Sequence, residues 1–155
     1  PFSPSASRFP VSGSIVSTIK WGGEKTENGL FVHEEYNVCL DNSPYNKVPD
    51  LGIFSEKIKG RTLVERCEEK ALFVVVETNY TRRRAKLLYN NSIIEAAVDM
   101  GELVKGDLRG KISEIELELY EGNLNDVIEL TNKISENYKL EPENLSKFAR
   151  AINLK

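Results

Sequence analysis

The segment KISEIELELY, residues 111–120, alternates acidic and apolar side chains with a period of two. Because successive side chains of a β-strand point to opposite faces of a sheet, this pattern predicts a strand with two chemically distinct faces. These faces carry Ile115, Leu117 and Leu119 on one side and Glu114, Glu116 and Glu118 on the other. Carboxylates about 6.5 to 7 Å apart along a strand repel one another, so a row that faces inward needs cations. The alternative is a solvated row on the protein surface.

A second segment, SIIEAAVDMG, favours the interpretation that involves cations. Glu95, Ala97 and Asp99 share one face of the predicted strand, and the small Ala97 leaves space between the two acids. Hard carboxylate oxygens suit Mg²⁺ or Mn²⁺, and Mg²⁺ is usually held by one or two carboxylates together with substrate phosphates and water. The two acidic strands together therefore predict a divalent metal site.

The strand predicted for TRRRAKLLYN has one basic face. Arg82, Arg84 and Lys86 fall on the same side, and Lys20 shares a face with Thr18 in the earlier segment IVSTIK. Arginine forks and compact lysine charges suit phosphate oxygens, and a polyphosphate requires several of them. The alternative is an edge strand whose charges prevent aggregation. Combined with the acidic strands, the basic strand predicts a pocket for a metal-bound triphosphate.

The other segments predict an α+β protein built on an antiparallel sheet or barrel. IVSTIK and FVHEEYNVCL are separated by turn residues and predict a β-hairpin, and Leu124, Val127, Ile128, Thr131 and Ile134 recur at helical spacing. Further predicted elements are a loop over 42–52, a helix within SEKIKGRTLVERCEEK, a strand over 70–78, a strand that ends at Gly101, a loop containing Gly106 and Gly110, a helix over 123–137 and a short helix that begins near Pro142.

Composition excludes several classes of function. The net charge of −3 gives no general attraction to a nucleic-acid polymer or to an anionic membrane. Cys39 and Cys67 are far apart and match no zinc or redox motif, and His33, the only histidine, fits no catalytic triad. There is no phosphate-binding loop or dinucleotide fingerprint. There is no run of 18 or more apolar residues and no evident signal peptide, and two reduced thiols fit the cytoplasm, so we expect a cytoplasmic protein without membrane partners.

The order of these segments resembles a CYTH domain, the fold of the triphosphate tunnel metalloenzymes. The resemblance extends from Val16 to Leu154 and depends on STIK, HEEYNV, the arginine strand, IIEAAVDMG, ISEIELELYEG and LSKFARAI. The sequence most resembles the bacterial inorganic-triphosphatase branch. The resemblance implies an eight-stranded antiparallel barrel whose tunnel binds a small-molecule triphosphate with Mg²⁺ or Mn²⁺ and hydrolyses it.

The family motifs assign roles to individual residues of this chain. The resemblance implies phosphate binding by Lys20, Arg82, Arg84, Lys147 and Arg150, metal binding by Asp99, Glu114 and Glu116, and catalytic roles for Glu35, Glu114 and Glu116. Glu95 and Glu118 are secondary candidates. The same residues could serve a class IV adenylate cyclase, in which a ribose hydroxyl replaces water. A module that binds a polyphosphate or a nucleotide without turnover is the other alternative.

The sequence departs from the family pattern at three places. We find neither the ExExK strand nor the RxR strand before STIK, His33 occupies the usual arginine position of the following RxE motif, and Ala151-Ile152 replaces a common Gly-Tyr. A missing strand would remove metal ligands and open the barrel. We therefore expect residues 1–14 to be an atypical or truncated segment before a CYTH-like domain over 15–155. In this segment only Arg8 could be a remnant of the RxR strand. Whether the protein forms a homodimer is left open.

Overall fold

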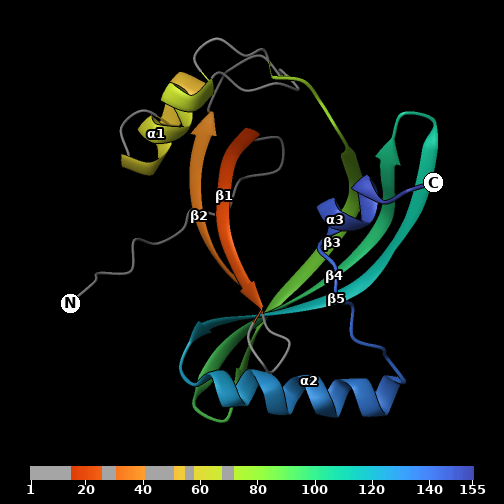
Figure 1. Ribbon diagram of the computed structural model, residues 1–155. Helices are drawn as coiled ribbons and strands as arrows, with labels where there is room; N and C mark the ends of the chain where they lie inside the picture. Colours follow the sequence, from red (N-terminus) through yellow and green to blue (C-terminus); the bar gives the residue numbers. More distant parts are fainter. Residues whose placement is uncertain (1–14, 26–30, 41–50, 55–57, 68–71) are drawn as a thin grey trace. The chain divides into compact units, whose positions relative to one another are not determined.

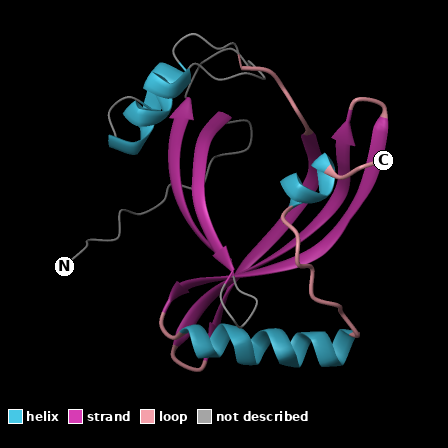
Figure 2. Cartoon of the chain, in the orientation of Figure 1, coloured by secondary structure: helices cyan, strands magenta, loops and turns pink. Residues whose placement is uncertain are grey.

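The computed structural model describes residues 15–25, 31–40, 51–54, 58–67 and 72–155. The chain divides into two compact units, residues 1–74 and residues 75–155. Their described parts contain antiparallel sheets and few helices, which confirms the predicted α+β class (Figure 1; Figure 2). No helix in the described ranges is long and apolar enough to cross a membrane.

The N-terminal unit contains the predicted β-hairpin. Its elements are β1 (Ile15–Lys25), β2 (Phe31–Leu40), the 3-10 helix η1 (Leu51–Phe54) and α1 (Ile58–Cys67). Strands β1 and β2 pair antiparallel, and α1 confirms the helix predicted within SEKIKGRTLVERCEEK. Phe54 is buried, and its ring meets that of Tyr36 edge-on with 6.0 Å between ring centroids. Most of the predicted loop over 42–52 lies outside the described residues.

The C-terminal unit is a three-stranded antiparallel sheet with two helices. Its elements are β3 (Glu77–Tyr89), β4 (Ser92–Lys105), β5 (Leu108–Glu121), α2 (Leu124–Tyr138) and α3 (Lys147–Ile152). The strands follow one another in the order β3-β4-β5. Both connections are tight turns, and each contains a residue with positive φ, Asn90 at 50° and Gly106 at 58°. Asparagine and glycine tolerate this backbone conformation better than other residues.

The strand register brings the predicted acidic and basic rows onto one face of this sheet. Three rows of neighbours cross it, namely Arg82–Asp99–Glu114, Arg84–Ala97–Glu116 and Lys86–Glu95–Glu118. We call the face that carries these side chains the site face. The cations all come from β3, and the acids come from β4 and β5. The alternation predicted from KISEIELELY is therefore confirmed.

Helices α2 and α3 pack on opposite faces of the sheet. Beneath α2, Ile94 is buried with Val127 and Leu130, and Leu117 and Leu119 pack against them. Beneath α3, which packs on the site face, the cluster consists of Leu103, Ile112 and Ala151. Figure 1 shows α2 across one end of the strands and α3 beside the other end. From this end, the charged side chains of α3 reach Asp99 and Glu114 on the site face.

The structure corrects several predicted boundaries. Residues 72–76 are not a strand, because β3 begins only at Glu77, and the apolar side chains of 72–75 are exposed. Strand β4 continues past Gly101 to Lys105, because each residue of this stretch has pairing partners in β5. Gly110 lies within β5 and not in a loop.

Two further predictions concern the last helix and the barrel. Helix α3 begins at Lys147 and not near Pro142, because the Ser146 side chain accepts a hydrogen bond from the Ala149 N–H and caps the helix there. The eight-stranded barrel stays a prediction. Among the described residues there are five strands in two separate sheets, and no closed barrel is present.

A polar cluster joins the N-terminus of α2 to the β3–β4 turn. The buried Ser92 hydroxyl donates to the Asp126 carboxylate at 2.5 Å and accepts from the Asn123 N–H at 2.8 Å. Asn90 donates to the same carboxylate at 3.1 Å. The hydrogen bonds from Ser92 and Asn90 lower the pKa of the Asp126 carboxyl. A carboxylate in the first turn of a helix is also favoured by the helix dipole.

Substitution of Asp126 should change how the stability of the protein depends on pH. Because the folded-state pKa of Asp126 lies below its unfolded value of about 3.9, its contribution is fully present above about pH 4 and is lost as the pH falls through the folded-state pKa. We expect Asp126→Asn to lose less stability than the wild type on acidification, as measured by urea unfolding at several pH values. Equal acid dependence in both proteins would contradict this assignment.

Gly101 is required by the close approach of β3 to β4. A Cβ atom at this position would lie 2.1 Å from the Asn79 carbonyl oxygen and 2.5 Å from the Tyr80 Cα. We expect Gly101→Ala to lower the free energy of unfolding by about 1 to 3 kcal/mol, because backbone atoms would have to shift. Gly110→Ala is the matched control, since its nearest neighbour, at 2.8 Å, is the flexible end of Leu154. Urea unfolding of both variants tests this explanation, because Gly101→Ala should lose more free energy of unfolding than Gly110→Ala.

Candidate metal and phosphate site

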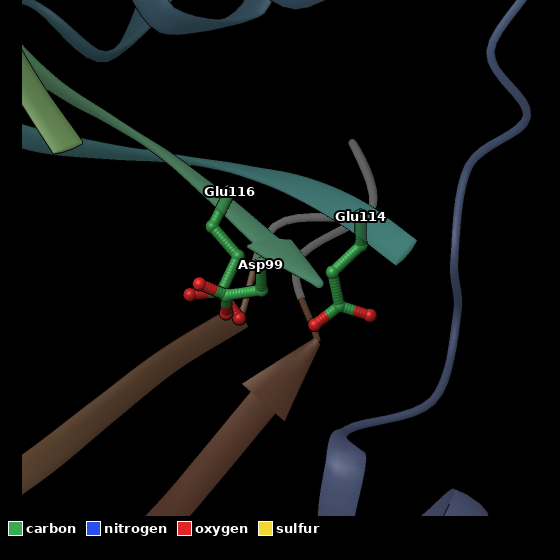
Figure 3. Close-up of side chains that lie close together, drawn as sticks. All are labelled: Asp99, Glu114 and Glu116. Carbon is green, nitrogen blue, oxygen red and sulfur yellow. The ribbon is translucent and has the colours of Figure 1, made fainter. Parts of the chain in front are cut away.

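Three carboxylates meet on the site face. Asp99 from β4 and Glu114 and Glu116 from β5 each offer an oxygen, and these oxygens lie within 4.8 Å of one another. Figure 3 shows the three side chains leaving the same face of the sheet. The Asp99 side chain has no exposed surface, whereas that of Glu116 is 46% exposed. The cluster therefore reaches from the protein interior to solvent.

Arg82 neutralises the buried acid from the neighbouring strand. Its Nε and Nη2 atoms donate to the two oxygens of Asp99 at 2.7 and 2.6 Å, and Nη2 also donates to Glu116. Burial alone would raise the pKa of the Asp99 carboxyl, but hydrogen bonds from Arg82 and Lys147 outweigh it and lower that pKa. The hydrogen bond to Asp99 in turn raises the pKa of Arg82, against the opposing effect of burial.

Lys147, the first residue of α3, contacts all three acids. Its Nζ lies 2.8 Å from Asp99 Oδ2 and 2.6 Å from Glu116 Oε1, and it also forms an ion pair with Glu114. Burial would lower the pKa of this ammonium group, but its three hydrogen-bonded carboxylates raise it above the ordinary value for lysine. Lys147 is thus a stable positive charge at the centre of the acidic cluster.

Arg150, one turn further along α3, supplies a third cation. Its Nη2 pairs with Glu114, and its Nη1 lies 3.6 Å from Glu143. The Nε atom of Arg150 is buried and has no hydrogen-bond partner in the described part of the chain. A buried donor without an acceptor is costly, so this N–H lacks the compensation that the other donors of Arg150 receive from Glu114 and Glu143.

The adjacent rows of the site face continue the alternation of charges. Arg84 Nη1 lies 3.9 Å from Glu95 Oε1, and Lys86 Nζ lies 3.4 Å from the centroid of the Tyr120 ring. Glu118 is the neighbour of Glu95 in the register. The predicted phosphate ligand Arg84 is thus on the same face as Arg82, in the row that also contains Glu116 of the acidic cluster.

Sequence reasoning missed Tyr80. Its ring centroid lies 5.6 Å from the Arg82 guanidinium carbon and 5.2 Å from the Lys147 Nζ, so it contacts two of the cations at the site. Tyr80 lies two residues before Arg82, and strand parity alone would have placed it on the site face. An isolated aromatic residue carries no motif, and the position of α3 was needed to connect it with Lys147.

Two predicted site residues belong to the N-terminal unit. Lys20 on β1 and Glu35 on β2 are register neighbours and form an ion pair of 2.6 Å with both side chains exposed. Such an exposed pair contributes little to stability. Their predicted roles in phosphate binding and catalysis stay predictions. The side chain of His33 and the segment containing Arg8 lie outside the described residues.

The chemistry of the acidic cluster fits a divalent metal. Carboxylate oxygens are hard ligands of the kind that Mg²⁺ and Mn²⁺ prefer, and three of them converge at this point. Asp99, Glu114 and Glu116 are the residues that would hold the ion. The basic side chains around them are those suited to phosphate oxygens.

Comparison with known proteins finds a relative whose activity is known. The chain is similar to an inorganic triphosphatase from Haemophilus influenzae, with 29% identity over 122 residues. The match covers 77% of this chain and 32% of that protein, so the chain spans about a third of the length of this relative. No protein-family model matches the chain. The relative supports the triphosphatase resemblance of the sequence without establishing membership of a family.

Removal of the Arg82 charge should destabilise the C-terminal unit. Arg82→Leu leaves the buried Asp99 carboxylate with Lys147 as its remaining cation, and we expect the free energy of unfolding to fall by about 2 kcal/mol. This is below the usual cost of breaking a buried pair because the Arg82 side chain is 34% exposed. Arg83→Leu, at the next position on the opposite face, should change it by less than about 0.5 kcal/mol. Equal losses in urea unfolding would contradict the assignment.

Proposed function

We propose that this chain binds a triphosphate group together with Mg²⁺ or Mn²⁺ and hydrolyses it. The observation that carries the proposal is the meeting of Asp99, Glu114 and Glu116 with three cations on one sheet face. A triphosphate needs both kinds of group, since cations bind its oxygens and carboxylates hold its metal. The similarity to an inorganic triphosphatase supports the same reaction.

In this proposal the basic side chains bind the substrate. Arg82 and Arg150 present planar forks suited to phosphate oxygens. Lys147 adds a compact charge between them. Arg84, in the next row, would extend the basic surface along β3 for a further phosphate group. Lys20 is the proposed phosphate ligand of the N-terminal unit.

The acidic side chains would hold the metal and orient the attacking water. A bound Mg²⁺ or Mn²⁺ would neutralise phosphate charge and lower the pKa of a coordinated water. Glu116 is the most exposed of the three acids and is placed to accept a hydrogen bond from water. The water oxygen bonds to the terminal phosphorus, and the bond from that phosphorus to the bridging oxygen breaks, which releases phosphate and diphosphate. Glu35 is the proposed further acid from β2.

We also propose the finer architecture that the family resemblance implies. In this interpretation residues 15–155 form a CYTH-like domain, and the strands of both units belong to an eight-stranded tunnel barrel. The antiparallel pairing and the sorting of acids and bases onto one face support this arrangement. The strands that would close the barrel must come from segments beyond the five strands described.

Hydrolysis of inorganic tripolyphosphate is the direct test of the proposed function. We expect phosphate release with Mg²⁺ or Mn²⁺ and its loss with a chelator. Glu116→Gln should slow release at least ~100-fold while tripolyphosphate binding, measured by calorimetry, is retained. Glu121→Gln, at the far end of β5, is the matched control and should stay active. Metal-dependent binding without any turnover would instead identify a binding module.

A substrate comparison separates hydrolysis from cyclisation. Tripolyphosphate, thiamine triphosphate and ATP present the same phosphate groups, so product analysis is needed as well as rate. We expect free phosphate from tripolyphosphate to exceed the product from ATP, because the similar protein is an inorganic triphosphatase. If ATP instead gives more product than tripolyphosphate, and the products are diphosphate and a cyclic nucleotide, the reaction is that of a cyclase.

A further inference from the structure

The ammonium group of Lys147 lies where a metal ion would have to bind. Its Nζ contacts Asp99 Oδ2, Glu114 Oε1 and Glu116 Oε1, one oxygen from each acid of the cluster. A divalent ion bridging the same three residues needs oxygens from this set, which lie within 4.8 Å of one another. The ammonium group and a divalent ion would therefore compete for the same carboxylate oxygens, and their like charges would repel at short distance.

The oxygens not used by Lys147 are held by arginines. Glu116 Oε2 accepts from Arg82, and Glu114 Oε2 accepts from Arg150. Departure of Lys147 would therefore free one oxygen on each glutamate while the other oxygen keeps the carboxylate in position. Two preoriented carboxylates are the usual protein contribution to a Mg²⁺ site, and substrate phosphates and water complete the coordination.

The lysine ammonium can leave the cluster without unfolding α3. The helix is anchored at its other end, where Ala151 is fully buried against Leu103 and Ile112. Lys105 Nζ also donates to the Ile152 and Leu154 carbonyl oxygens at 2.5 and 3.2 Å. Lysine carries its charge on a flexible four-carbon stem, so a change of side-chain torsions is sufficient to move it.

We propose that Lys147 is a built-in counter-ion that keeps a divalent metal out of the acidic cluster until a polyphosphate accepts its ammonium group. Metal and polyphosphate then bind cooperatively, because each removes the obstacle to the other. This inference rests on the proposed function for the identity of the anion, but the competition between Lys147 and the metal does not depend on turnover. By linkage, the metal strengthens polyphosphate binding by the same factor by which the polyphosphate strengthens metal binding.

The test measures Mn²⁺ binding by electron paramagnetic resonance on the full chain. Titrations are made with Mn²⁺ alone and with imidotriphosphate, a slowly hydrolysed analogue whose own Mn²⁺ complex is measured without protein. We expect the analogue to tighten Mn²⁺ binding by the wild type at least ~10-fold, within the usual range of coupling between sites. Lys147→Met should bind Mn²⁺ alone at least ~10-fold more tightly than the wild type, and the coupling should largely disappear.

Lys133→Met is the matched control, because it removes the same charge from α2 at a distance from the acidic cluster. Methionine and lysine have similar helix propensities, so α3 should be retained in Lys147→Met, and urea unfolding checks this. Unchanged or weaker Mn²⁺ binding by a folded Lys147→Met protein would overturn the proposal. Tighter binding by this variant in a protein that does not hydrolyse tripolyphosphate would preserve it and refute the proposed function instead.

Discussion

The Asp99 carboxylate of the C-terminal unit has no exposed surface, and the need to neutralise its buried charge constrains the residues around it. An unpaired buried charge costs several kcal/mol, so Asp99 requires cations with well-oriented donors. Arg82 can provide its two hydrogen bonds only if β3 and β4 keep their register, and Lys147 can contribute only if α3 packs on the site face. Strand register, helix position and charge pairing are therefore parts of one arrangement.

The two faces of the C-terminal sheet have different roles. One face packs against α2 through apolar side chains, and the site face carries the charged side chains of the candidate site. The face under α2 buries Ile94 with side chains from the helix, whereas the site face buries Leu103 and Ile112 at its α3 end and the small Ala97 among its charged rows. The charged side chains of the site face form ion pairs with one another in place of contacts with water. Such a network contributes less to stability than an apolar core would, and clusters of paired charges of this kind are typical of functional sites.

Most of what the sequence predicted about the site came from strand parity, which determines the side chains that share a face. It placed Glu114 and Glu116 together, opposite Leu117, because the period of two depends only on local backbone geometry. The strand predicted over 70–78 was wrong over 72–76, because an apolar run does not specify whether a partner strand lies beside it. The contacts of Lys147 were beyond prediction from spacing, since they depend on where α3 packs. Their chemistry was anticipated only through the family resemblance.

The connectivity of β3, β4 and β5 also bears on how the site assembles. Arg82 and Asp99 are 17 residues apart in the chain, and a tight turn joins their strands. The acids of β4 and β5 are brought together by a second tight turn. Loops this short cost little entropy to close, and folds dominated by such local pairings form rapidly. We therefore expect the charged face to form as two successive hairpins, before α3 adds its cations to the aligned acids.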